Sequence, residues 1–152
     1  MEARGKNITL SSENLSIGYR SKKKNSVVAK NINFKVFGGE LTAIIGVNGV
    51  GKSTLLRTLG KVQPKLSGEI KLNERSLGAF KPLKLASEIS VVLTEPIASK
   101  NMTVLELVAL GRSPYTNWLG TLAKVDKSKI ESALNQMELH ELKDKKCQGV
   151  IK

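Results

Sequence analysis

The stretch G-V-N-G-V-G-K-S-T, residues 46–54, decides the fold class because it matches the phosphate-binding loop pattern Gly-x-x-x-x-Gly-Lys-Ser. The glycines at 46, 49 and 51 permit backbone angles that side chains forbid, so successive N–H groups can turn toward phosphate oxygens. Lys52 supplies a mobile charge for the β- and γ-phosphates, the Ser53 hydroxyl can ligate Mg²⁺, and Thr54 adds a hydroxyl in the first helical turn. A plain strand-to-helix turn is the alternative, but the pattern arises by chance only on the order of once in a few hundred such chains.

The residues on either side of the loop supply the strand and helix that a phosphate loop requires. Leu41–Ile45 is a short, mostly apolar run that predicts a strand buried on both faces. Ser53–Leu59 has apolar residues at helical spacing and ends at Gly60. Alternating or strongly apolar runs predict further strands at residues 14–19, 27–36, 69–72 and 89–93. This order predicts an α/β core.

Three further helices are predicted downstream, and two of them carry start signals. A short helix is predicted over residues 82–88. Thr103 caps a helix over 104–110, with Glu106 placed as in a capping box, and Asp126 caps a last helix that runs to about residue 139. Helical material is therefore added toward the end of the α/β core.

Composition limits the classes of protein to which the chain can belong. The formal net charge of +12 could mark a nucleic-acid or anionic-membrane partner, but only residues 22–24 form a tight lysine run, which favours a solvated surface. The single cysteine, Cys147, excludes an internal disulfide and fits a reducing compartment. The N-terminus lacks the apolar core of a secretory signal, and no run approaches the roughly 18 apolar residues of a spanning helix. We expect a cytoplasmic chain that meets the membrane only through a partner.

The sequence segments around the loop resemble those of one protein family. L-T-A-I-I-G-V-N-G-V-G-K-S-T-L-L-R-T-L at 41–59, N-I-N-F-K-V-F-G-G-E-L at 31–41 and S-G-E-I-K-L-N at 67–73 are similar to the ATPase subunits of ATP-binding cassette (ABC) transporters. The resemblance implies the N-terminal half of a P-loop NTPase (RecA-like) core, with an antiparallel β portion and part of a helical subdomain. It also implies ATP and Mg²⁺ as cofactors. The nucleotide-binding residues implied are Tyr19, Gly46, Asn48, Gly49, Gly51, Lys52, Ser53 and Thr54, with Ser53 on the metal.

Tyr19 and residues 101–120 carry the finer parts of the resemblance. Tyr19 lies where the family places an aromatic ring that stacks on adenine; packing at a strand end is the alternative. N-M-T-V-L-E-L-V-A-L-G-R-S-P-Y-T-N-W-L-G, residues 101–120, is similar to the subgroup that powers importers of iron–siderophore complexes, haem and cobalamin. In that subgroup this surface docks on the membrane-spanning permease, and two ATPase subunits pair as a homodimer. The expected division is a β and P-loop part at 1–95, a partial helical subdomain at 96–147 and an unstructured tail at 148–152.

Two departures from the family pattern affect the expected chemistry. Glu95 stands where the family usually has a glutamine; it could ligate a metal through its carboxylate, or be a solvated residue at a strand end. The signature loop L-S-G-G-Q, a strand ending in Asp-Glu and the switch histidine are absent. We therefore expect an N-terminal fragment that binds nucleotide, has no catalytic residue of its own and hydrolyses ATP poorly.

Two other classes of protein remain as alternatives. A kinase or GTPase would use the same loop, although the Asn-Lys-x-Asp motif with which a GTPase reads its base is absent. A non-catalytic basic module that binds nucleic acid would explain the net charge, but the chain has no recognition motif and no aromatic residues interleaved with its basic ones. We expect no nucleic-acid partner.

Overall fold

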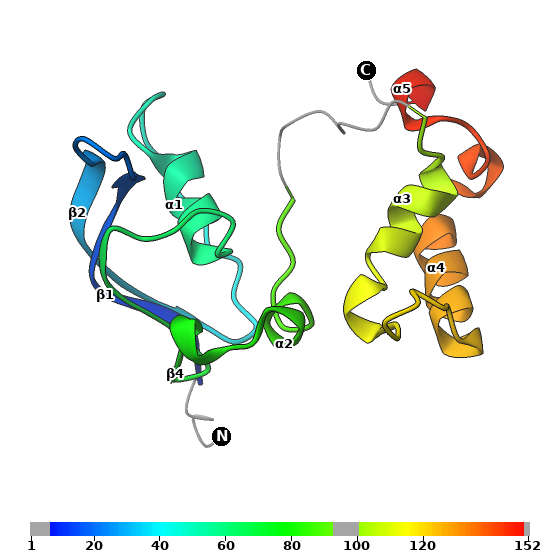
Figure 1. Cartoon of the computed structure of the whole chain (residues 1–152), viewed down its shortest axis with the longest axis horizontal. Helices are drawn as coiled ribbons and strands as arrows, with labels where there is room; N and C mark the ends of the chain where they lie inside the picture. The colour runs from blue at the N-terminus through cyan, green and yellow to red at the C-terminus, as the bar shows by residue number, and fades with distance from the viewer. Residues whose placement is uncertain (1–6, 93–100, 151–152) are drawn as a thin grey trace. The chain divides into compact units, whose positions relative to one another are not determined.

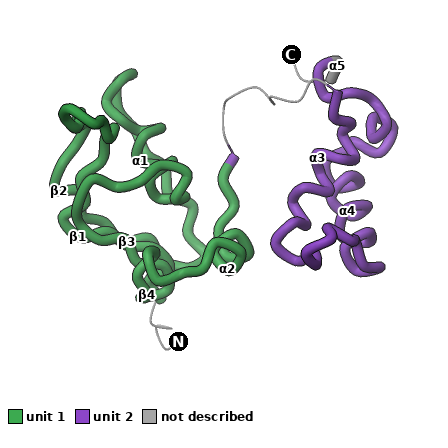
Figure 2. Tube along the Cα trace, viewed as in Figure 1, with its two compact units in different colours: residues 1–91 green, residues 92–152 purple. Residues whose placement is uncertain are grey.

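The computed structural model of the chain describes residues 7–92 and 101–150. Figure 1 shows a sheet-bearing part followed by a helical part, and Figure 2 colours them as two compact units, Met1–Val91 and Val92–Lys152. Each unit has a hydrophobic core of its own. The expected domain division at 95/96 falls within residues 93–100, outside the described residues. No helix in the described ranges is both long and apolar enough to cross a bilayer.

The sheet of the first unit is antiparallel throughout and has the order β2-β1-β3-β4. Its strands are β1 Ile8–Tyr19, β2 Ser26–Phe37, β3 Ser67–Leu72 and β4 Arg75–Ser76. Alternation of apolar and polar residues produces this sheet, because alternate side chains of a strand lie on one face. In β3, for example, Ile70 and Leu72 are buried, whereas Lys71 between them is only half-buried.

Helix α1, Lys52–Leu59, supplies the other side of this core. Leu59 packs with Leu15 and Ile17 of β1 and with Ile70 and Leu72 of β3. The unit is completed by a 3₁₀ turn, η1 Leu77–Ala79, and by α2 Pro82–Ala86. The predicted helix after the loop and the strands at 14–19, 27–36 and 69–72 are therefore confirmed.

Two predicted strands are wrong over the residues that the structure describes. Neither Leu41–Ile45 nor residues 89–92 forms a strand; residue 93 lies outside the described part. Leu41, Ile45 and Val92 are almost fully exposed, at 101%, 93% and 97%. The apolar pattern predicted burial between neighbouring strands, but no described strand pairs with either segment. A strand exists only where a partner satisfies its backbone.

The second unit is helical. It contains α3 Val104–Leu110, η2 Ser113–Tyr115, α4 Lys124–Gln136, η3 His140–Leu142 and α5 Cys147–Val150. The predicted capping box of α3 is confirmed: Thr103 Oγ1 accepts from Glu106 N at 3.2 Å, and Glu106 Oε2 accepts from Thr103 N at 2.8 Å. Val104, Ile130, Leu134 and Cys147 form the core.

Two expectations for the second unit need correction. Asp126 is not the N-cap of α4, because the helix begins two residues earlier with Ala123 as its N-cap. Asp126 Oδ2 instead reaches back and accepts from Ala123 N at 2.9 Å. The expected tail at 148–152 is also helical as far as residue 150, in α5. Cys147 anchors that helix, since its side chain is buried and its N–H donates to Met102 O at 2.9 Å.

Candidate nucleotide-binding site

Residues 46–51 form a loop that leads directly into α1. Gly49 and Gly51 adopt positive φ angles of 83° and 107°, which glycine tolerates far better than other residues. Gly51 is also the N-cap of α1, and a Cβ on it would lie 2.5 Å from Val28 Cγ1. No side chain caps the helix, and its first turn contains no acidic residue. The N–H groups of that turn have no partner within the helix, which makes this end of α1 suited to an anion.

The Lys52 side chain lies back over the loop from the first position of α1. Its Nζ donates to Gly46 O at 2.6 Å and to Val47 O at 2.9 Å. The ammonium therefore lies within the loop that is expected to surround the phosphates. An ammonium has three donors and can exchange these carbonyl oxygens for phosphate oxygens.

Tyr19 is brought to the same place although it is 35 residues away from Thr54 in the sequence. The Tyr19 hydroxyl lies 3.3 Å from Thr54 Oγ1, so the end of β1 meets the first turn of α1. The tyrosine is 51% exposed, which leaves ring surface open to a ligand. This position is compatible with adenine stacking.

The remaining predicted residues differ in their surroundings. Asn48 lies at the exposed turn of the loop, Ser53 is exposed on α1, and Thr54 is buried. Ser53 fits a magnesium site because Mg²⁺ takes few protein ligands and completes its shell with water and phosphate oxygens. Glu95 lies outside the described residues. Within those residues, no group of three or more His, Cys, Asp or Glu side chains could hold a metal by itself.

The structure also identifies two participants that the sequence pattern did not indicate. Val28 of β2 sits against Gly51 and leaves no room for a side chain there. The Val47 carbonyl accepts from Lys52. No motif could reveal either one, because the first is a contact between distant segments and the second is a backbone group.

Comparison with known proteins gives the class to which this fold and loop belong. Residues 29–151 match the family model described as "ABC transporter". The chain belongs to the ABC transporter family and carries part of its ATP-binding domain, in a P-loop fold that includes an antiparallel sheet.

Curated relatives support this assignment. The chain is 46% identical over 125 residues to an uncharacterized ABC transporter ATP-binding protein of Methanocaldococcus jannaschii, covering 82% of this chain and 42% of the relative. It is 30% identical to the iron(3+)-hydroxamate import ATP-binding protein FhuC of Bacillus subtilis, with 93% of this chain and 51% of the relative covered. It is 32% identical to the achromobactin transport ATP-binding protein CbrD of Dickeya dadantii, with 84% of this chain and 46% of the relative covered. The chain spans about half the length of these relatives.

Solved structures agree on the fold. A nucleotide-free ATP-binding cassette from an ABC transporter aligns with a TM-score of 0.72 at 24% identity, covering 93% of this chain and 58% of that one. CbiO1 of Clostridium perfringens, part of the ABC transporter complex cbiONQ, aligns with a TM-score of 0.66 at 26% identity (92% and 54%).

Proposed function

We propose that this chain is the N-terminal part of an ATP-binding subunit that drives the import of iron–siderophore complexes, haem or cobalamin. The observation that carries the proposal is the phosphate loop, in which Lys52 reaches back over the loop at the N-terminus of an uncapped helix. Of the relatives named above, one is named for iron(3+)-hydroxamate import and another for achromobactin transport, and the former favours an iron-chelate cargo.

Nucleotide binding uses the side chains around that loop. Backbone N–H groups of residues 46–54 and the Lys52 ammonium hold the phosphates, while Tyr19 stacks on the adenine. Ser53 ligates the magnesium ion, and Glu95 is the second candidate ligand of that ion. The metal, when bound, neutralises phosphate charge; the loop's own contribution is to position the phosphates.

The test of this step is a thermal titration of the full chain with ATP and with GTP, each with Mg²⁺. Binding to the native state alone raises the unfolding midpoint, so ATP is expected to raise it more than GTP. The variant Tyr19→Ala should give a smaller shift with ATP because the stacking surface is lost, and Tyr19→Phe should keep the shift because the ring remains. An equal response to the two nucleotides would favour a GTPase or another P-loop enzyme.

We propose further that the surface of residues 101–120 docks on the permease. Trp118 is 92% exposed and Leu119 is 66% exposed, yet the loop that presents them is well held. Asn117 Oδ1 accepts from the backbone N–H groups of Leu119 and Thr121 at 3.1 and 3.0 Å. A rigid loop that offers a tryptophan loses little entropy on association, and tryptophan is enriched among residues that dominate interface energies.

The experiment for this surface is co-purification with the permease of the same transporter. Trp118→Ala is expected to weaken recovery about tenfold or more, since truncation of such an anchor costs about 2 kcal/mol or more. Met137→Ala is the matched control, because Met137 is a large exposed apolar residue of the same unit at 68%. Equal recovery of both variants would place the permease contact elsewhere.

Two further parts of the proposal concern the working assembly. The ATPase acts as a homodimer at the inner face of the cell membrane and touches the membrane only through the permease. The 152 residues alone hydrolyse ATP slowly, because they contain no signature loop, no Asp-Glu strand and no switch histidine to stabilise charge and position water.

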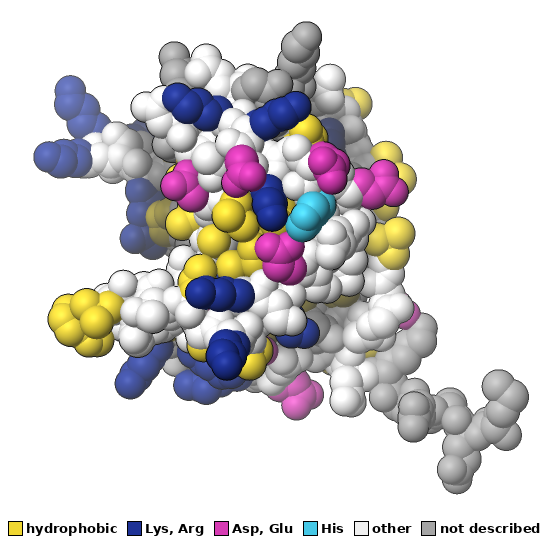
Figure 3. Space-filling view, turned by 90° about the vertical axis from the view of Figure 1, so that its right-hand side faces the viewer, with side chains coloured by type: hydrophobic (Ala, Val, Ile, Leu, Met, Phe, Trp, Pro, Cys, Tyr) yellow, Lys and Arg dark blue, Asp and Glu magenta, His cyan; other side chains and the backbone are white. Residues whose placement is uncertain are grey.

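A nucleic-acid function has less support than ATP-driven import. On the face that Figure 3 presents, acidic and basic side chains lie interspersed around an apolar area, without a continuous basic stripe. Electrostatic binding to a phosphate backbone works through such a stripe. Retention of the chain on immobilised DNA that falls steeply with salt would support the alternative.

A further inference from the structure

A cavity of about 360 Å³ lies in the first unit at the end of α1 opposite the phosphate loop. Its walls are mainly apolar and include Ile70 of β3, Leu77 of η1 and Pro64. Its volume falls within the range of small-molecule sites, which are typically apolar with a few placed polar groups. Thr58 of the cavity wall lies six residues along α1 from Lys52, which is about 9 Å of helix.

The charged side chains of the cavity are all basic. Arg20, Lys61 and Lys65 line it, and none of its described lining residues is acidic. Lys65 Nζ lies 3.2 Å from Glu69 Oε2, and Arg20 Nη2 donates to Lys65 O at 3.0 Å. Lys61 Nζ donates to Leu77 O at 3.3 Å, and no described carboxylate lies within ion-pair distance of it. The Lys61 ammonium therefore retains donors and an uncompensated charge at an apolar cavity.

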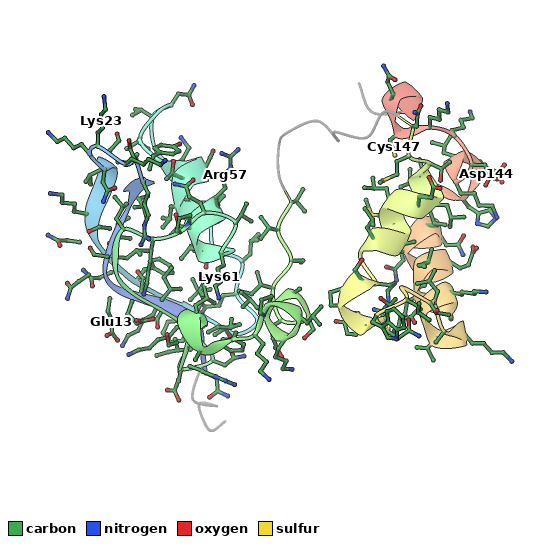
Figure 4. All side chains as sticks on the ribbon, in the orientation of Figure 1. Glu13, Lys23, Arg57, Lys61, Asp144 and Cys147 are labelled. Atoms are coloured by element: carbon green, nitrogen blue, oxygen red, sulfur yellow. The ribbon has the colours of Figure 1, made fainter. Side chains whose placement is uncertain are left out.

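The backbone holds Lys61 in a defined place. Figure 4 labels this residue just past the end of α1, whose C-cap is Gly60. Lys61 has a φ of 57°, its N–H donates to Thr58 O at 3.1 Å, and Val62 N donates to Arg57 O at 2.9 Å. These bonds form a helix-terminating Schellman motif, in which the residue with positive φ is usually glycine. A lysine at this position is therefore fixed by two backbone bonds beside the cavity.

We propose that this cavity binds a small amphipathic monocarboxylate. The apolar body lies against Ile70, Leu77 and Pro64, and the carboxylate accepts hydrogen bonds from Lys61 Nζ. A single charge suits the site because Lys65 is already paired with Glu69, and Arg20, which donates to Lys65 O, adds positive potential without having to bind the ligand. The site is separate from the phosphate loop and does not depend on the proposed function.

Calorimetric titration of the full chain with decanoate, below its micelle concentration, tests the proposal. Saturable one-to-one binding is expected, with decanol and acetate each binding at least about tenfold more weakly because each lacks one half of the recognised chemistry. Lys61→Gln should weaken decanoate binding about tenfold or more, and Lys61→Arg should restore most of it. Lys35→Gln is the matched control: it removes the same charge from an exposed position on β2 and should bind as the wild type does.

A second variant keeps the test decisive if Lys61→Gln alters folding. Gly78 lines the cavity, and a Cβ on it would meet only Ser76 Oγ, at 3.5 Å, so Gly78→Leu can fill space there while leaving every charge in place. We expect this variant to keep the circular dichroism of the wild type and to lose decanoate binding. Unsaturable binding, decanol binding as tight as that of decanoate, equal loss in Lys35→Gln, or full binding by Gly78→Leu would each overturn the proposal.

Discussion

Lys52 is the residue on which nucleotide affinity is expected to depend most. Its ammonium already lies at the loop, 2.6 Å from Gly46 O, and a hydrogen bond to a charged group contributes about 1.5–3 kcal/mol. Lys52→Ala should therefore weaken ATP binding about 10- to 100-fold, as measured by titration calorimetry. Lys35→Ala, which removes a lysine from an exposed site on β2, should leave the affinity unchanged. Unchanged affinity in Lys52→Ala would show that the loop is not the phosphate site.

Asp126 makes the helical unit sensitive to acid. The Arg112 side chain, at 2.8 Å, and the Ala123 N–H hold the pKa of Asp126 below its ordinary value. A lowered folded-state pKa means that the ionised carboxylate stabilises the fold above the unfolded pKa of about 4, and that this stabilisation is lost as the pH falls through the folded pKa. We expect Asp126→Asn to be less stable than the wild type at pH 7, and the difference to shrink below about pH 4.

Urea unfolding at pH 7 and pH 3, followed by circular dichroism, measures this difference. Asp144→Asn is the control, because Asp144 is an exposed aspartate of the same unit. A stability gap between Asp126→Asn and the wild type that persisted unchanged at pH 3 would contradict the role assigned to the Arg112–Asp126 pair.

At the scale of single elements, the capping box of α3 has a definite stability effect. Thr103→Ala removes the acceptor for Glu106 N and should cost about 1 kcal/mol of unfolding free energy. Thr121→Ala, at an exposed loop position of the same unit, should change stability by less than about 0.5 kcal/mol. Urea unfolding of the two variants distinguishes the effect of losing the cap from the effect of removing any threonine. Equal stability of both variants would contradict a stabilising role for the capping box.

The elements predicted correctly from the sequence are those with local causes. Thr103 and Glu106 define the start of α3 by themselves, and alternation defines β2, because the residues that decide each outcome are neighbours in the chain. Leu41–Ile45 is different: its apolar composition shows a preference for burial, but a strand requires a partner that local composition cannot supply. The sequence does not separate an N-cap role for Asp126 from the third helical position that it occupies, because an acidic residue suits both.

The residues of the candidate site likewise fall into those that their sequence neighbours predict and those that only long-range packing places. The loop, Lys52 and the following helix were predicted because a phosphate loop is one continuous segment. A place for Tyr19 at the nucleotide site is implied only by the family resemblance, and its contact with Thr54 depends on strand pairing and helix packing that the sequence does not show. The contact of Val28 with Gly51 could not be predicted, because it depends on how closely two distant segments approach.

At the scale of the whole molecule, the exposed apolar residues of segment 41–45 are expected to favour self-association of the chain in solution. Leu41→Lys combined with Ile45→Lys is expected to change unfolding free energy by no more than about 0.5 kcal/mol per site, because both side chains already face solvent. The same double variant should bind less hydrophobic dye and self-associate less, as measured by dye fluorescence and light scattering. By contrast, Leu15→Lys should unfold the first unit, since Leu15 is fully buried.

Strong destabilisation of the double variant would mean that segment 41–45 is packed in solution. Little change in the stability of the double variant would agree with a segment 41–45 that is exposed to solvent in these 152 residues. The relatives are about twice as long, so the same substitutions in one of them would show whether its additional residues cover this segment.

The contacts of Lys52 with Gly46 O and Val47 O have a consequence for the thermodynamics of ligand binding. A lysine side chain loses up to about 2 kcal/mol of rotamer entropy when it is immobilised. Here the immobilisation accompanies folding, before any ligand arrives, so an incoming anion meets a side chain that is already ordered. Association at this loop is therefore an exchange of oxygen acceptors around one ammonium. The enthalpy of anion binding at this loop therefore includes the difference in hydrogen-bond strength between the ammonium's bonds to carbonyl oxygens and its bonds to phosphate oxygens.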